Sequence, residues 1–255
     1  MKFIWFIFLA SFCMVSCSKD DNEIKTNPFS LEASYEVPVG DTLNIPIRNG
    51  SGELSFENLN ESNIEVAYSR LKFVTQETKG YLSIIGKKRS EENNIIITDD
   101  KTKEECCSAI KVTSPYIALH FENSESLFKK WGMPTGDLSF ILVANTQKDC
   151  YVLSYNNMNF QYSKIPVYFG SYCMSPDGEL LSFNLKSKYG NFEKTFKILA
   201  IDCNIFSKLS LGEDIDKEPR GEYLCKVVDE TPSQNEIINA IVNYKGFIIP
   251  NGILK

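Results

Sequence analysis

Apolar and polar residues alternate with a period of two along most of the chain after residue 28, as in strands that bury one face. Between residues 29 and 114 the apolar runs are short and are separated by turn signals, including Asn49-Gly50-Ser51-Gly52 and Asp99-Asp100-Lys101. The runs contain Leu31, Ala33 and Tyr35; Leu43, Ile45 and Ile47; Leu54 and Phe56; Ile64 and Val66; Leu82 and Ile84; 95–98; and 109–112. No helical period interrupts them, so this part predicts a β-sandwich.

Residues 115–255 predict a second, antiparallel β-rich domain. Its expected strands are 116–121, 138–144, 150–155, 165–173, 180–186, 192–202 and 223–229. The loops between them are short, which favours antiparallel neighbours. Leu127, Phe128 and Trp131 share one side of a short helix predicted over 124–130. A capping box at 233–236 predicts a second helix up to Gly246. The fold class is therefore mainly all-β with one or two short helices.

Four pieces of the first domain resemble bacterial Ig-like domains. They are Val39-Gly40-Asp-Thr-Leu-Asn-Ile, Asn49-Gly-Ser-Gly52, Tyr81-Leu-Ser-Ile-Ile-Gly86 and Ile95-Ile-Ile-Thr-Asp99, in that order. The resemblance covers residues 29–114 and implies an Ig-like β-sandwich. It departs from the pattern at Cys106-Cys107, where such domains usually carry an ordinary strand.

The first 16 residues predict a signal peptide, because Lys2 precedes an apolar run too short to span a bilayer. Met14-Val-Ser-Cys17 resembles a bacterial lipobox, which implies cleavage before Cys17 and acylation of its thiol. Residues 17–28 would then be a polar tether. The alternative is an uncleaved anchor in which Cys17 is an ordinary cysteine.

Two further short motifs suggest an exported protein. Lys19-Asp20-Asp21 resembles the surface-export signal of Bacteroidota lipoproteins, which implies an outer-membrane, cell-surface location. Asp41-Thr42-Leu43 resembles the O-glycosylation site of exported proteins from the same group, with Thr42 as the acceptor; alternatively, Thr42 simply begins a strand. The net charge of −6 argues against nucleic acid as a partner, because such partners require basic patches.

Six cysteines remain after Cys13 in the leader and Cys17, and an even number in an exported chain suggests disulfides. We expect at least one bridge in the second domain. Its candidate cysteines are Cys150, Cys173, Cys203 and Cys225, and the pairs Cys150–Cys173 and Cys203–Cys225 would each close a loop of about twenty residues. The alternative is that several of the cysteines are small buried apolar residues.

The sequence offers little catalytic chemistry. His120 is the only histidine, and the alternation of its strand predicts that it faces solvent, away from Ile117, Leu119 and Phe121. No Gly-x-Ser-x-Gly elbow or Cys-x-x-Cys pair is present, so neither a metal site nor a cofactor is expected. A hydrolase could use two carboxylates far apart in sequence, but 33 acidic residues single out no pair.

The remaining candidate is a binding surface. Tyr155, Phe160 and Tyr162 flank a loop that contains three asparagines, and such rings and amides together can hold a sugar or a peptide. Alternatively, these rings pack into the sheet. We therefore expect a non-catalytic envelope lipoprotein that binds a glycan or a partner protein. The alternatives are an envelope hydrolase with a carboxylate pair and a carrier with an apolar cavity.

Overall fold

The computed structural model describes residues 29–71, 78–156, 161–201, 204–211, 215, 218–230, 236–247 and 249–254. Cys17, the Lys19–Asp21 segment, Phe160 and Cys203 lie outside these residues. Strands dominate the described chain, together with two short helices, so the predicted all-β class is confirmed. Neither helix is long and apolar enough to cross a membrane.

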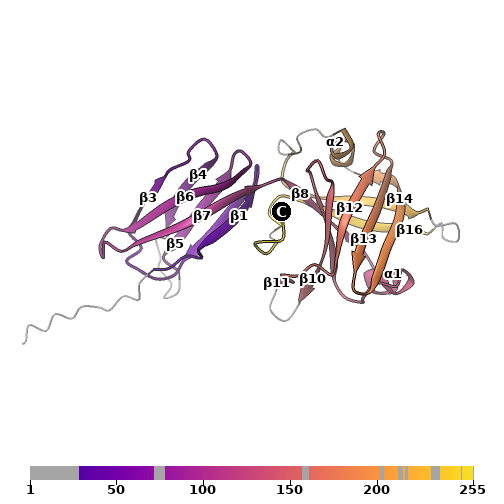
Figure 1. Ribbon diagram of the computed structural model, residues 1–255, viewed down its shortest axis with the longest axis horizontal. Coiled ribbons are helices and arrows are strands. Elements are labelled where there is room, and N and C mark those ends of the chain that lie inside the picture. Colours follow the sequence, from indigo (N-terminus) through magenta and orange to yellow (C-terminus); the bar gives the residue numbers. More distant parts are fainter. Residues whose placement is uncertain are drawn as a thin grey trace, which may run out of the picture.

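Seven strands form two sheets in the first part of the described chain. They are β1 (Ser34–Pro38), β2 (Thr42–Ile47), β3 (Leu54–Asn58), β4 (Ile64–Arg70), β5 (Gly80–Gly86), β6 (Ser90–Asp99) and β7 (Glu105–Thr113). One sheet has the order β1-β7-β6-β3 and the other β2-β5-β4. β1 runs parallel to β7, whereas the remaining neighbours are antiparallel. Figure 1 shows these strands as one body of the molecule, which we call the sandwich.

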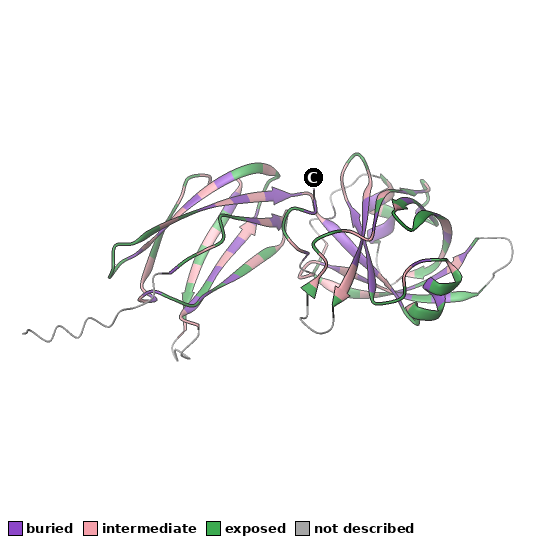
Figure 2. Ribbon diagram, turned by 60° about the horizontal axis from the view of Figure 1, so that its bottom comes forward, coloured by how far each residue is buried: buried purple, intermediate pink, exposed green. Residues whose placement is uncertain are grey.

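The two sheets of the sandwich share one apolar core. Buried and exposed residues alternate along their strands (Figure 2), because successive side chains of a strand point to opposite faces. Leu82 and Ile84 of β5 and Ile95 and Ile97 of β6 are fully buried in the same cluster, one pair from each sheet. Burial of each such side chain contributes roughly 1.5–3 kcal/mol, so these inner rows hold the two sheets together.

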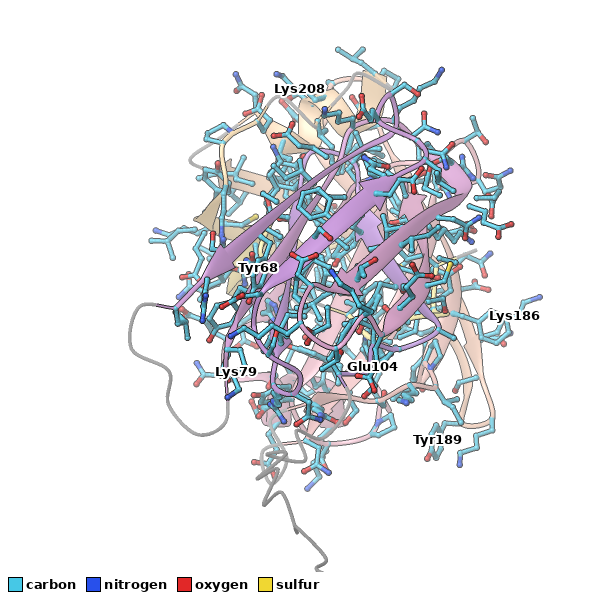
Figure 3. All side chains as sticks on the ribbon, turned by 90° about the vertical axis from the view of Figure 1, so that its left-hand side faces the viewer. Tyr68, Lys79, Glu104, Lys186, Tyr189 and Lys208 are labelled. Atoms are coloured by element: carbon cyan, nitrogen blue, oxygen red, sulfur yellow. The ribbon has the colours of Figure 1, made fainter. Side chains whose placement is uncertain are left out.

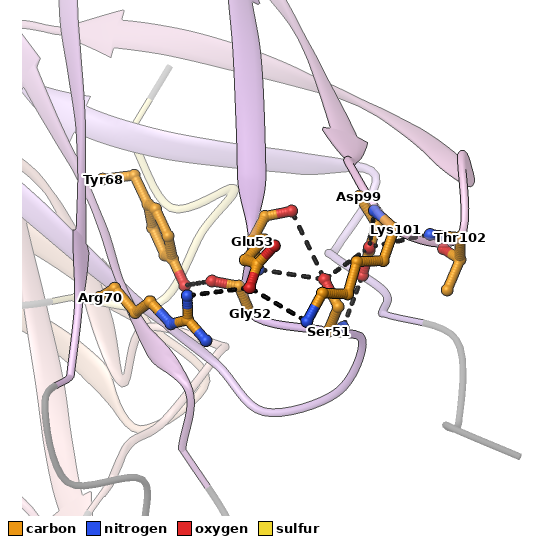
Figure 4. A network of polar contacts seen from close by, with 8 residues as sticks. All are labelled: Ser51, Gly52, Glu53, Tyr68, Arg70, Asp99, Lys101 and Thr102. Atoms are coloured by element: carbon orange, nitrogen blue, oxygen red, sulfur yellow. Dashed lines mark hydrogen bonds and ion pairs between the residues drawn. The ribbon is translucent and has the colours of Figure 1, made fainter. Parts of the chain in front are cut away.

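A buried carboxylate joins two of the predicted turns at one end of the sandwich (Figure 4). Asp99 has no exposed surface and accepts four hydrogen bonds. Its Oδ2 accepts from the Ser51 N–H at 2.6 Å, and its Oδ1 accepts from the Ser51 hydroxyl at 2.6 Å. The backbone N–H groups of Lys101 and Thr102 also donate to Oδ1, at 3.0 and 3.2 Å. Burial alone would raise the pKa of Asp99, but these hydrogen bonds outweigh it and hold the pKa below its usual value.

Eight strands of the second part close into a barrel, on the right in Figure 1. They are β8 (Tyr116–Phe121), β9 (Leu138–Val143), β10 (Asp149–Asn156), β12 (Tyr168–Met174), β13 (Leu180–Ser187), β14 (Gly190–Ile201), β15 (Gly221–Asp229) and β16 (Ile237–Tyr244). Each pairs antiparallel with its neighbours, and β16 pairs with β8 to complete the ring. β11 (Gln161–Tyr162) pairs antiparallel with the last residues of β10, outside that ring.

Large apolar side chains fill the interior of the barrel. Phe140, Phe183, Phe192 and Phe196 are almost fully buried and pack ring against ring, with centroids 5.2–6.4 Å apart. Helix α1 (Ser124–Lys130) lies between β8 and β9, as predicted, and α2 (Ile205–Leu211) lies between β14 and β15. Aromatic packing of this kind makes the barrel interior a solid core.

A charge pair lies at the edge of this apolar core, between a buried aspartate and a lysine that is 17% exposed. Asp229, at the end of β15, is 1% exposed, and its Oδ2 lies 2.8 Å from the Lys194 ammonium. The indole N–H of Trp131 donates to the same oxygen at 3.1 Å. Trp131 directly follows α1 and packs against Phe121 and Phe196, with ring centroids 5.3 Å away in both cases. The pair therefore joins α1 to two strands on another side of the barrel.

The second predicted helix is wrong, because residues 237–244 form strand β16. Ile238, Ala240, Val242 and Tyr244 face the barrel core, which is a period of two. The isoleucine and valine spacing fits a helix equally well, and the local pattern alone could not separate the two. Backbone hydrogen bonds to β15 and β8 close the barrel, and they stabilise this segment as a strand and not as a helix. Helix α2 was not predicted.

One of the expected disulfides is not formed. Cys150 and Cys173 are free thiols. Cys150 is buried on the inner face of β10, whereas Cys173 is exposed on the outer face of β12, so their side chains point to opposite sides of the barrel wall. Burial raises the pKa of Cys150 well above its usual value, and this thiol packs as a small apolar residue. A bridge between Cys203 and Cys225 involves a residue outside the described chain.

The segment after β16 lies between the sandwich and the barrel (Figure 1) and contacts both. The Gly246 N–H donates to Asp41 Oδ2 at 2.8 Å. The Asn251 amide donates to the Ser34 carbonyl at 3.2 Å and accepts from the Glu36 N–H at 3.3 Å. Apolar residues of this C-terminal segment cover the outer face of β8, β9 and β10 in one cluster, namely Phe247, Ile249, Ile253 and Leu254.

Candidate functional site

Two of the three predicted binding aromatics lie side by side on the β10–β11 hairpin. Tyr155 and Tyr162 are directly opposite each other in the strand register, and their ring centroids are 4.8 Å apart at an interplanar angle of 50°. Both are partly exposed. Directly opposed aromatic rings stabilise a hairpin, so this pair forms a defined surface. The third aromatic, Phe160, and the asparagines at 157 and 159 lie outside the described residues.

Tyr162 connects this pair to the C-terminal segment and to the outer face of β9. Its ring lies 4.8 Å from that of Phe247, at an angle of 54°. Its hydroxyl accepts a hydrogen bond from the Ser139 hydroxyl at 3.3 Å. Burial raises the pKa of the Tyr162 hydroxyl above its usual value, so this hydroxyl stays protonated at neutral pH. The hairpin is thus held by contacts on both sides of Tyr162, and Tyr155 is the outer member of the pair.

His120 lies beneath this surface, where the C-terminal segment covers it. Its Nδ1 is 3.0 Å from the Ser139 hydroxyl, and its ring lies 5.3 Å from that of Phe247. Its Nε2 is buried and has no hydrogen-bond partner in the described part of the chain. Burial lowers the pKa of His120, and the nearby charge of Asp137 offsets this only in part. The prediction that His120 faces solvent is therefore wrong. Its side chain points away from the barrel core, as expected, but Phe247 covers it.

The Ser139–His120 contact is not arranged as a catalytic pair. Ser139 is 1% exposed, so its hydroxyl is inaccessible to a substrate. A serine nucleophile needs an open approach and a base that a third group orients. In the described residues, no group of three His, Cys, Asp or Glu side chains could hold a metal ion. The arrangement places aromatic rings and hydroxyl groups next to one another on the outer face of the barrel.

No protein-family model matches the chain, and no curated protein matches its sequence. The candidate site is therefore defined by the residues that the fold brings together, and not by comparison with a known family. Two of these were not predicted. Ser139 is the one polar residue in a strand that is otherwise fully apolar, a signal that could have marked it. Phe247 reaches the site from the segment beyond β16, and no local pattern points to it.

Carboxylates also come together, in a shallow depression on another part of the barrel. Glu193 and Glu230 line a hollow of about 370 Å³ together with Lys194 and Thr195. Both glutamates are exposed. A glycoside hydrolase needs its two carboxylates on opposite sides of an enclosed sugar ring, and this hollow is open to solvent.

The predicted glycosylation residue lies at the start of β2. Thr42 is exposed, and its backbone N–H donates to Asp41 Oδ1 at 2.8 Å. The neighbouring oxygen of that carboxylate accepts from Gly246. Thr42 therefore lies beside the contact between the sandwich and the C-terminal segment, and its hydroxyl stands on an accessible surface.

Proposed function

We propose that this protein is a lipid-anchored outer-membrane protein that binds a glycan or an envelope protein without chemical conversion. The contact surface would be the Tyr155–Tyr162 pair and the loop that it flanks. The observation that carries this proposal is the opposed, partly exposed tyrosine pair, with Tyr162 fixed from behind by Phe247 and Ser139. Rings that are already fixed lose little conformational entropy when a ligand stacks on them.

The sequence motifs support the cellular location in this proposal. Acylation of Cys17 would hold the protein in the membrane, and the Lys19–Asp21 segment would direct it to the outer face. The strand orders β1-β7-β6-β3 and β2-β5-β4 support an Ig-like sandwich, which would separate the barrel from the membrane. Cys17→Ala tests the anchor: acyl labelling should disappear and the precursor should remain uncut.

The two alternatives have less support. A carrier requires an enclosed apolar cavity of several hundred Å³, whereas aromatic rings occupy the interior of this barrel. A hydrolase requires two converging carboxylates in a cleft, whereas Glu193 and Glu230 line an open depression. Binding at an exposed aromatic surface requires neither feature.

Glycan arrays and immobilised envelope fractions, both probed with the purified mature protein, test this function. Tyr155→Ala and Tyr162→Ala should each weaken binding by roughly tenfold or more, since each removes a stacking ring. Tyr189→Ala is the matched control, because Tyr189 is an exposed tyrosine between β13 and β14. Turnover of any polysaccharide or peptide would contradict the non-catalytic proposal. Binding that both substitutions leave unchanged would remove the tyrosine pair as the site.

A further inference from the structure

A second hollow lies on the outer face of the barrel, over β10, β12 and β13. Its volume is about 460 Å³, within the range of small-ligand sites. Its lining combines one exposed aromatic ring with charged, amide and hydroxyl side chains; the residues are Asp149, Tyr151, Phe169, Gly170, Ser171, Asn184 and Lys186. We infer that this hollow, here called the ladder hollow, binds a pyranose unit of a neutral carbohydrate. This inference goes beyond the proposed function, because it requires neither the Tyr155–Tyr162 pair nor the lipid anchor.

The strand register arranges these side chains in two parallel rows. One row is aromatic and cationic: Tyr151 pairs with Phe169, and Phe169 pairs with Lys186. The other row is polar: Asp149, Ser171 and Asn184 are joined in the same way. Directly opposed residues have Cβ atoms about 4.5–5.5 Å apart, and the two rows are two residues apart along each strand. A ring-shaped ligand can therefore lie on Phe169 while its edge reaches the polar row.

Phe169 supplies the stacking face. Its side chain is 58% exposed on the outer surface of β12, whereas Tyr151 beside it is only 8% exposed. Tyr151 is packed in the cluster that the C-terminal segment covers, so it forms a fixed wall. An exposed phenylalanine leaves apolar surface in water, and covering its face with the C–H side of a sugar ring recovers that free energy.

The polar row matches the hydroxyl groups of a pyranose. Asn184 and Ser171 are exposed and can each donate and accept, and the Asp149 carboxylate accepts only. Asp149 is already oriented, because its Oδ2 accepts from the Asn145 amide at 2.7 Å and its N–H donates to Asn145 Oδ1 at 3.1 Å. None of the described residues donates a hydrogen bond to its other carboxylate oxygen, Oδ1, which can therefore accept from a ligand. Preorganised acceptors of this kind favour binding, since the ligand does not have to order them.

Charge and size favour a neutral sugar over other ligands. The hollow holds one carboxylate, from Asp149, and one ammonium, from Lys186, so its formal charge is balanced. Lys186 projects from the surface (Figure 3), where it can bend over a bound ring and donate to a hydroxyl. A docking protein would need a wider apolar area than the single exposed ring of Phe169.

Close packing of β12 on β13 keeps the floor of the hollow in place. Gly170 faces the opposite side of β12 from Phe169, and a Cβ there would lie 2.2 Å from the Asn184 carbonyl oxygen. Only glycine therefore fits, and the two strands approach closely beneath the ladder hollow. This contact fixes the backbone that carries both Phe169 and Asn184.

Isothermal titration calorimetry on the full mature protein tests the inference. The probes are gluco-, manno-, xylo- and chito-hexaose, and we expect at least one to bind with a millimolar or lower Kd. Phe169→Ala should weaken that binding by roughly tenfold to a hundredfold, the effect of removing a buried aromatic contact. Asn184→Ala should weaken it by roughly fivefold to tenfold. Tyr189→Ala is the control, because Tyr189 is 57% exposed, as Phe169 is 58%, but lies outside the hollow.

The outcomes separate this inference from the proposed function. If no hexaose binds, or if Phe169→Ala and Asn184→Ala bind as the wild type does, the ladder hollow is not a carbohydrate site. Sugar binding that Tyr155→Ala abolishes and Phe169→Ala preserves would also overturn it, while supporting the tyrosine pair. Sugar binding lost with Phe169→Ala and kept with Tyr155→Ala supports the hollow alone.

Discussion

Replacing Asp99 with asparagine should selectively destabilise the sandwich. Asparagine can keep the carbonyl oxygen at the Oδ1 position, which accepts from the Ser51 hydroxyl, Lys101 and Thr102. Its amide nitrogen would then face the Ser51 N–H, which donates to Oδ2 in the wild type at 2.6 Å. One buried donor loses its acceptor, and three charge-assisted hydrogen bonds become neutral ones. We expect a loss of about 3 kcal/mol in the free energy of unfolding.

The two cores allow this loss to be assigned to one part of the molecule. Trp131 is the only tryptophan in residues 17–255, and it packs in the barrel. Tryptophan fluorescence during urea unfolding therefore reports the barrel, whereas far-ultraviolet circular dichroism reports both parts. Asp99→Asn should lower the sandwich transition and leave the fluorescence transition nearly unchanged. The matched control is Asp100→Asn, because the Asp100 side chain is exposed and its carboxylate accepts one hydrogen bond from the described residues, donated by the Ser55 hydroxyl at 2.8 Å.

The same carboxylate should make the sandwich sensitive to acid. The pKa of Asp99 is lower in the folded protein than its ordinary value, which is about 3.9 in the unfolded chain. Its contribution to stability is therefore complete above that value and is lost as the pH falls through the folded pKa. Asp99→Asn should lack this part of the acid-induced loss. Equal stability and equal pH dependence in wild type and Asp99→Asn would refute the role of this network.

Three further predictions concern the barrel. The pKa of His120 is lowered by burial, so barrel stability should fall as the pH drops below about 6.5, the ordinary histidine value, and urea midpoints at pH 7.5 and 5.5 should differ less in His120→Gln. Iodoacetamide should label exposed Cys173 in the native protein and buried Cys150 only after denaturation. A non-reducing peptide map in which neither cysteine is labelled after denaturation would contradict the free thiols. Asp229→Asn should destabilise the barrel by about 1–2 kcal/mol in tryptophan-monitored unfolding, because the hydrogen bonds that the buried carboxylate accepts from Lys194 and Trp131 lose their charge; an unchanged midpoint would argue against a role for this pair.

Much of the fold could be predicted from the period of the sequence. Strands such as β5 and β13 bury alternate residues, and this alternation is visible in the amino-acid order itself. Helix α1 was also predicted, since its apolar residues share one side. The closure of the barrel could not be predicted, because the β16–β8 pairing joins residues more than 110 positions apart. That pairing is the reason why β16 is a strand despite its helical spacing.

The candidate site was predictable only in part. The sequence predicted that Tyr155 and Tyr162 flank a polar loop, but it did not predict strand β11, which pairs the two tyrosines in a hairpin. The cover over His120 comes from Phe247, in a segment without secondary structure, and period-based reasoning cannot place such a segment. The two rows of the ladder hollow depend on the register between β10, β12 and β13, which the sequence leaves open until the turns are known.

Photo-crosslinking in living cells tests the binding function most directly. Tyr155 is replaced by benzoylphenylalanine, which bonds to whatever lies against it on irradiation, and the exposed Tyr189 is replaced in the same way as the control. The proposed contact surface predicts a discrete adduct from position 155, with a glycan or one envelope protein, and none from position 189. No adduct at position 155, or the same adducts at both positions, would contradict it.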